Sequence, residues 1–89
     1  MTHLTLERLA DGRQYHFRPA GTRNGRPIYR DAKARDLVIF WDPQRGWAFR
    51  DPARGALVGA GGTADLPPEG LWTGSGPSQV TLYRLMRRG

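Results

Sequence analysis

Basic side chains between residues 18 and 35 are the ones whose type and spacing could bind a ligand. Six arginines and lysines recur there every two to five residues, with Tyr29 among them. Guanidinium groups bind phosphates and carboxylates, and an exposed aromatic ring beside them can stack on a base. A solvated charged face, partly paired with Asp31 and Asp36, is the simpler interpretation of the same pattern. The candidate binding residues of this segment are Arg18, Arg23, Arg26, Tyr29, Arg30 and Arg35.

The tryptophans form a second group that could contact a ligand, because bases, sugars and prolines stack on indole rings. Trp41 and Trp47 flank a predicted turn. We therefore favour a cross-strand core pair over a stacking platform for these two. Trp72 follows a proline-rich loop and is expected to lie partly exposed. It joins the candidate residues, with carbohydrate or peptide binding as a further hypothesis.

Catalytic and metal-binding patterns are hard to assemble from this sequence. The chain has no cysteine, and its histidines are His3 and His16. Nucleophilic catalysis requires a base oriented beside the nucleophile, and the sequence nominates no such group. Asp42 and Asp51 are expected to cap turns, and the spacing of a Ca²⁺-binding loop is missing. We expect no catalytic residue, no metal, no cofactor and no enzymatic activity.

Residues 59–64 match the G-x-G-x-x-A pattern of dinucleotide-binding loops. That pattern binds pyrophosphate only where its glycines open a helix. Asp65-Leu66-Pro67-Pro68 follows directly and cannot form that helix. We interpret the match as a coincidence within a glycine-rich loop.

Two similar turn sequences organise the middle of the chain. Asp42-Pro43-Gln44-Arg45-Gly46 recurs nine residues later as Asp51-Pro52-Ala53-Arg54-Gly55. Aspartate accepts backbone N–H groups at the first turn position, proline presets φ at the second, and glycine tolerates positive φ. Short apolar stretches lie between and beside the tracts. This arrangement predicts an antiparallel meander.

The remaining segments are also strand-length, and none of ten or more residues has a helical period. Asp11-Gly12 and Asn24-Gly25 indicate turns, and Pro19–Gly25 is expected to be a loop. The segment Gly59–Gly70 is predicted to be a loop whose end is packed by Leu71 and Trp72. Strands are expected at 3–9, 14–18, 27–30, 37–41, 47–49, 56–58 and 79–85. The prediction is one all-β domain over residues 1–86, an antiparallel barrel or two-sheet sandwich of six or seven strands, with 87–89 as a frayed basic tail.

The chain resembles a small all-β accessory module with the loose pattern NGxPxY, LYW, WxI and PPxGW. The resemblance is carried by Asn24–Tyr29, Leu37–Trp41, Trp47 and Pro67–Trp72, about half of the chain. Ile39-Phe40-Trp41 replaces LYW, and Phe49 stands where the pattern has an aliphatic residue. The resemblance implies the fold and a role as an appended module, and it carries no ligand.

The most unusual feature of the composition is its excess of basic residues. The net charge is +6 and the pI about 11.1, with six arginines against two acidic residues in the first 30 positions. A positive field attracts nucleic acid, anionic membranes or acidic proteins. No apolar segment approaches the roughly 20 residues that cross a bilayer. Met1–Leu4 shows no secretory signal, so we expect a cytoplasmic protein.

These observations favour a small non-catalytic interaction module. The leading hypothesis is protein–protein contact through a sheet face or an exposed edge strand. The alternative is nucleic-acid binding through an arginine-rich loop face at residues 18–35. Nothing in the sequence indicates an oligomeric state.

Overall fold

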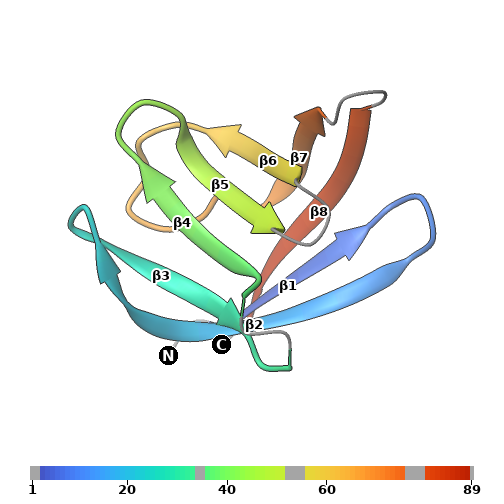
Figure 1. Ribbon diagram of the computed structural model, residues 1–89, viewed down its shortest axis with the longest axis horizontal. Coiled ribbons are helices and arrows are strands. Elements are labelled where there is room, and N and C mark those ends of the chain that lie inside the picture. The colour runs from blue at the N-terminus through green and yellow to red at the C-terminus, as the bar shows by residue number, and fades with distance from the viewer. Residues whose placement is uncertain (1–2, 34–35, 52–55, 76–79, 89) are drawn as a thin grey trace.

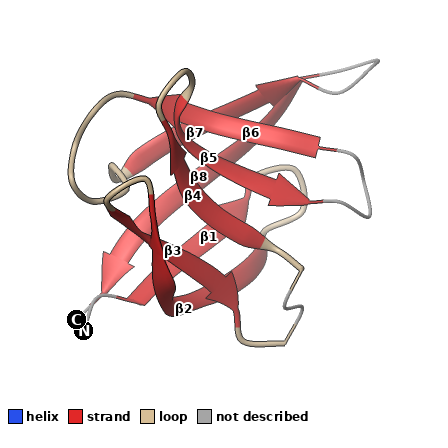
Figure 2. Ribbon diagram, turned by 60° about the vertical axis from the view of Figure 1, so that its left-hand side comes forward, coloured by secondary structure: helices blue, strands red, loops and turns tan. Residues whose placement is uncertain are grey.

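The fold is an antiparallel meander of eight strands that closes into a barrel. The computed structural model describes residues 3–33, 36–51, 56–75 and 80–88. Each strand pairs with the next, and β8 pairs with β1 (Figure 1 and Figure 2). This confirms the predicted all-β meander, as a barrel with one strand more than expected. The strands are β1 (His3–Arg8), β2 (Arg13–Arg23), β3 (Arg26–Asp31), β4 (Val38–Asp42), β5 (Gly46–Asp51), β6 (Ala56–Gly61), β7 (Gly70–Ser75) and β8 (Val80–Arg88).

The two Asp-Pro tracts connect neighbouring strands, as the sequence predicts. The Asp42 carboxylate accepts the backbone N–H groups of Gln44 and Arg45 at 2.7 and 3.2 Å, and Gly46 has φ of 83°. This confirms the first turn. The second tract joins β5 to β6, with Asp51 opposite Ala56. Its residues 52–55 lie outside the described part of the chain, so the capping role expected of Asp51 stays a prediction.

The hairpin of β2 and β3 is longer than expected. Asn24 and Gly25 both have positive φ, 55° and 77°, the geometry of a two-residue hairpin turn. The loop predicted over 19–25 is wrong, because β2 continues as far as Arg23. A β-bulge between Pro19 and Thr22 shifts the register, so the proline is accommodated within the strand.

The last third of the chain contains β7, the strand that was not predicted from the sequence. β6 continues through the glycines to Gly61, and β7 begins at Gly70. Glycine and threonine hide the alternation that would reveal β7. Within it Trp72 points inward and is buried, whereas Leu71 is 57% exposed and does not pack as expected. Arg87 and Arg88, predicted to fray, pair with Leu4 and His3 in the barrel.

Aromatic rings fill the interior. Phe49 lies edge-on to Phe17 and Tyr83, with ring centroids 5.8 and 5.5 Å apart. Trp41 and Trp47 are cross-strand partners, as predicted. Of the three Trp, three Tyr and three Phe residues, only Trp41 is not buried, and it is half-buried against the core. The surface therefore presents no fully exposed aromatic ring.

Candidate cationic groove

Three arginines, Arg18, Arg30 and Arg50, form a row across the outer face of β2 to β5, which we name the cationic row. Each alternates along its strand with buried residues, so its side chain points away from the core. Arg18 lies opposite Arg30, and Val38 lies opposite both Arg30 and Arg50. Neighbouring strands are about 4.8 Å apart, which brings these cations close together. Arg18 and Arg30 are like charges directly opposite each other, an arrangement that costs stability by itself.

The row crosses a surface groove at the place where β3 and β4 separate. These two strands pair only at Tyr29–Ile39 and Arg30–Val38, and Figure 1 shows them diverging beyond that point. The groove has a volume of about 430 Å³. Its lining, which we name the arginine groove, is Thr22, Arg23, Ile28, Arg30, Asp36, Val38, Phe40 and Arg50.

The floor of the arginine groove is apolar. Phe40 points outward on β4, yet it is only 8% exposed because neighbouring side chains cover it. One of these is Arg23, whose guanidinium carbon lies 5.1 Å from the Phe40 ring centroid, a cation–π contact. Ile28 and Val38 are half-buried beside it. The groove therefore combines an apolar floor with three guanidinium groups.

Proline explains why the β3–β4 ladder stops. Continued by two residues, the register of Tyr29 and Ile39 would place Pro27 opposite Trp41, and proline has no N–H to donate to the Trp41 carbonyl. The Asn24 side-chain amide donates to that carbonyl instead, at 3.2 Å. In the described barrel every strand also has two partners. The described barrel therefore has no strand without a partner on one side, which is what the exposed-edge hypothesis required.

Arg26 belongs to a different cluster from its neighbours in sequence. Its guanidinium donates to the carbonyls of Thr63 and Ala64 at 2.8 and 3.1 Å. The same group stacks on Trp41, with 3.7 Å from its carbon to the ring centroid. Arg26 thus holds a loop against the barrel and does not line the arginine groove.

That loop is also the partner of all three tryptophans. The indole N–H groups of Trp41, Trp47 and Trp72 donate to the carbonyls of Gly62, Ala64 and Pro68 at 3.1, 2.8 and 2.9 Å. Trp72 is 0% exposed, so the expectation that this residue lies partly exposed is wrong. The tryptophans anchor the loop after β6 to the core.

The structure brings together only part of the predicted set. Arg18, Arg23 and Arg30 share one face, and Tyr29 is only 1% exposed, which excludes it from surface stacking. Burial also raises the pKa of the Tyr29 phenol, so this group stays neutral near pH 7. Arg35 lies outside the described residues.

Arg50 is the groove residue that the sequence interpretation missed. It follows Phe49 in a predicted strand, so alternation alone places it outward. The first Asp-Pro turn pairs Asp42 with Gly46. Extending this pairing by four residues along both strands places Arg50 opposite Val38. The position of Arg50 on the outer face could therefore have been predicted from the turn.

The fold and the groove define a small closed β-barrel with a cationic surface groove. No family model, no curated protein and no solved structure matches the chain. The described residues also contain no helix of the length and apolar character that would cross a membrane.

Proposed function

We propose that this protein is a small non-catalytic interaction module that binds an acidic segment of a protein partner in the arginine groove. The observation that carries the proposal is the position of Arg23, Arg30 and Arg50 around one apolar floor. Aspartate and glutamate side chains pair with guanidinium groups through charge-assisted hydrogen bonds. An apolar side chain of the same segment gains contact with Ile28 and Val38.

A protein partner suits the groove better than a nucleic acid. Binding of single strands usually relies on aromatic rings that stack on bases, and the surface offers none that is fully exposed. Asp36 also lines the groove and would repel a phosphate chain. A peptide with a mixed acidic and apolar sequence can place an uncharged group beside this carboxylate. A cytoplasmic location, with which a chain without cysteine is compatible, is part of the proposal.

Selection from a random peptide library tests the proposal without a known partner. We expect the wild-type barrel to enrich peptides in which Asp or Glu flanks an apolar residue. The variant Arg23→Gln/Arg50→Gln should lose this enrichment. The variant Arg84→Gln/Arg88→Gln removes the same charge from exposed positions on β8 and should keep it.

Thermal unfolding of each variant checks that the barrel remains folded. The proposal fails if the two folded variants enrich the same peptides, or if the wild-type protein enriches no acidic sequence.

Nucleic-acid binding is the second candidate, since Arg18 extends the cationic row beyond the groove. The sequence assigned this activity to a loop face at residues 18–35. In the structure, residues 18–23 and 26–31 lie in β2 and β3, so the surface concerned is a sheet face.

A further inference from the structure

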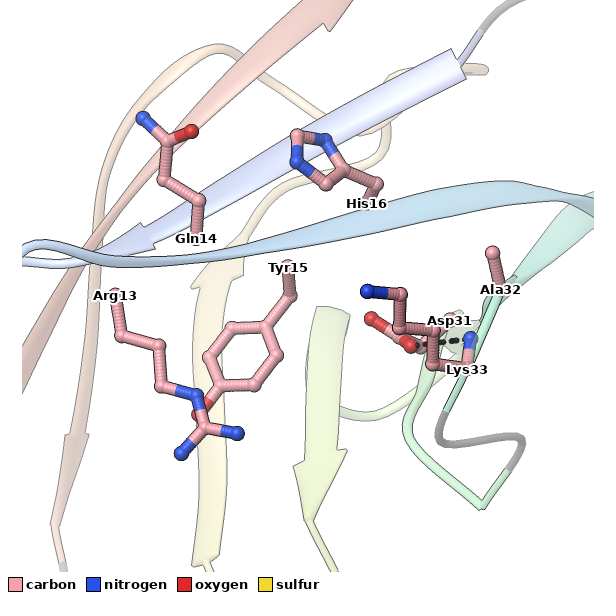
Figure 3. Close-up of a pocket in the computed structure, with 7 residues that line it drawn as sticks. All are labelled: Arg13, Gln14, Tyr15, His16, Asp31, Ala32 and Lys33. Atoms are coloured by element: carbon pink, nitrogen blue, oxygen red, sulfur yellow. Dashed lines mark hydrogen bonds between the residues drawn. The ribbon is translucent and has the colours of Figure 1, made fainter.

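A second pocket lies at the end of the barrel where β2 begins and β3 ends. It has a volume of about 340 Å³, and Figure 3 shows the side chains around it. Gln14 and His16 project to one side of β2, as the alternation with Tyr15 predicts, whereas Arg13 and Tyr15 project to the other. The lining residues are Arg13, Gln14, Tyr15, His16, Asp31, Ala32 and Lys33.

Arg8 reaches the same end of the barrel from inside. It alternates with the buried Leu4 and Leu6 on β1, so its side chain points inward, and that side chain is only 9% exposed. Nε and Nη2 donate to the two carboxylate oxygens of Asp11 at 3.0 and 2.7 Å. Nη1 is buried, and no group in the described part of the chain accepts its hydrogen bonds.

An unsatisfied N–H on a buried cation is costly, so this donor requires an acceptor. Asp11 already uses both oxygens on the other two nitrogens, and Asp11 Oδ1 also accepts the Arg13 backbone N–H at 3.2 Å. Within the described part of the chain no acceptor is left for this donor, and a water or a ligand oxygen would satisfy it.

Arg8 does not line the pocket itself, but it is the cross-strand neighbour of the lining residue Arg13. The register places Arg8 directly opposite Arg13 on β2 and Tyr83 on β8. The Arg13 guanidinium carbon lies 5.4 Å from the Tyr15 ring centroid, at the mouth of the pocket. Tyr15 is close enough to Arg8 to act on its charge, although the bond to Asp11 is the larger reason that the pKa of Arg8 is raised.

The charge balance of this region favours an anion. Asp11 neutralises Arg8, which leaves Arg13 and Lys33 facing the pocket with Asp31 as the acidic lining residue. The Asp31 carboxylate is engaged, because it accepts the Lys33 backbone N–H at 2.8 Å. The lining therefore places two cations against one carboxylate, and an anionic guest would balance the remaining positive charge.

We propose that this end of the barrel binds a small oxyanion, a carboxylate or phosphate group that accepts hydrogen bonds from Arg8 Nη1 and the Arg13 guanidinium. The pocket is at the lower end of the volumes of small-molecule sites, so the ligand is a small metabolite. This site lies on a different part of the barrel from the arginine groove and is independent of the proposed function.

Titration followed by NMR of the backbone amides and arginine Nε–H groups tests the proposal on the intact chain. The probes are inorganic phosphate and sodium acetate, each at ionic strength held constant with sodium chloride. We expect saturable shifts at the Arg8 and Arg13 Nε–H groups and at the Tyr15 amide. The preferred probe distinguishes a phosphate ligand from a carboxylate.

Replacing Arg13 distinguishes anion binding at this pocket from nonspecific attraction of anions to a basic protein. Arg13 is exposed, so Arg13→Gln should fold, and we expect affinity for the preferred anion to fall about tenfold, the loss of one charge-assisted contact. Arg84→Gln removes an equal charge from β8 and should leave the affinity unchanged. Shifts that never saturate, or that both variants weaken equally, would overturn the proposal and leave water as the partner of Nη1.

Discussion

Two arginines three positions apart show how differently one residue type is used in this chain. Arg23 covers Phe40 on the outside of the sheet, whereas Arg26 stacks on Trp41 and binds loop carbonyls. The sequence assigned both to one ligand-binding set. The different environments of Arg23 and Arg26 depend on a bulge in β2 and on a loop about 40 residues away. Neither feature can be predicted from the residues around these two arginines.

Arg26 is predicted to be a stabilising residue. Arg26→Ala removes two hydrogen bonds to loop carbonyls and a cation–π contact, so we expect the free energy of unfolding to fall by about 1–2 kcal/mol. Urea denaturation measures this loss. Arg45→Ala removes an exposed turn arginine and should change stability by less than about 0.5 kcal/mol. Equal effects of the two substitutions would contradict the assignment.

Asp11 gives the fold an acid-sensitive contact. Hydrogen bonds from the Arg8 guanidinium, with a smaller contribution from the Arg13 backbone N–H, lower its pKa from 3.8 to about 2. Since the unfolded chain binds this proton more tightly, the contribution to stability is complete well above pH 3.8 and is lost as the pH falls toward 2.

The variant Asp11→Asn makes this dependence measurable. We expect the stability difference between wild type and variant to shrink from about pH 5 to about pH 2, followed by urea midpoints at each pH. A difference that stays constant over this range would show that the Arg8–Asp11 pair does not couple folding to protonation.

At the scale of elements, turn chemistry was readable from sequence and strand length was not. Asp42, Asn24 and their glycines predicted both turns, because those conformations require those residue types. β7 was missed because glycine flanks Trp72 at positions 70 and 74, and glycine carries no periodic signal. Its strand character comes from pairing with β8, a tertiary contact.

The loop after β6 should depend on Trp47 more than on Trp41. Both indoles donate to loop carbonyls, but Trp47 is 0% exposed and Trp41 is half-buried. Trp47→Phe removes buried ring volume and a part-buried hydrogen bond, so we expect the free energy of unfolding to fall by about 2–3 kcal/mol. Trp41→Phe should cost roughly half as much.

Denaturant unfolding ranks the two tryptophan variants, and hydrogen exchange of the amides in residues 62–69 reports on the loop itself. We expect faster exchange there in Trp47→Phe. Unchanged exchange in both variants would mean that backbone contacts alone hold the loop.

At the scale of the whole molecule, closure of the barrel decides which parts of the sheet stay on the surface. The sequence predicted an antiparallel meander, but a barrel and a sandwich share the same alternation, so it could not choose between them. Closure pairs β1 with β8, so the proposed binding surface is on the outer face of the sheet. The arginine groove arises from the β3–β4 register, which places Arg30 and Arg50 on either side of Val38. The sequence between β3 and β4 has no turn motif that would fix this register, so it could not be predicted.

The net charge of +6 allows a final test that separates the two candidate functions. At low ionic strength we expect weak, sequence-independent binding of mixed single-stranded DNA, which salt abolishes because counterion release drives it. Fluorescence anisotropy across a salt series measures the slope of log K against log salt. If only the overall charge attracts the nucleic acid, Arg18→Gln/Arg50→Gln and Arg84→Gln/Arg88→Gln should lower this slope equally. If the nucleic acid lies along the cationic row, the first variant alone should lose about 0.7 per phosphate contact. That second outcome would replace the acidic protein segment by a phosphate backbone as the proposed ligand of this sheet face.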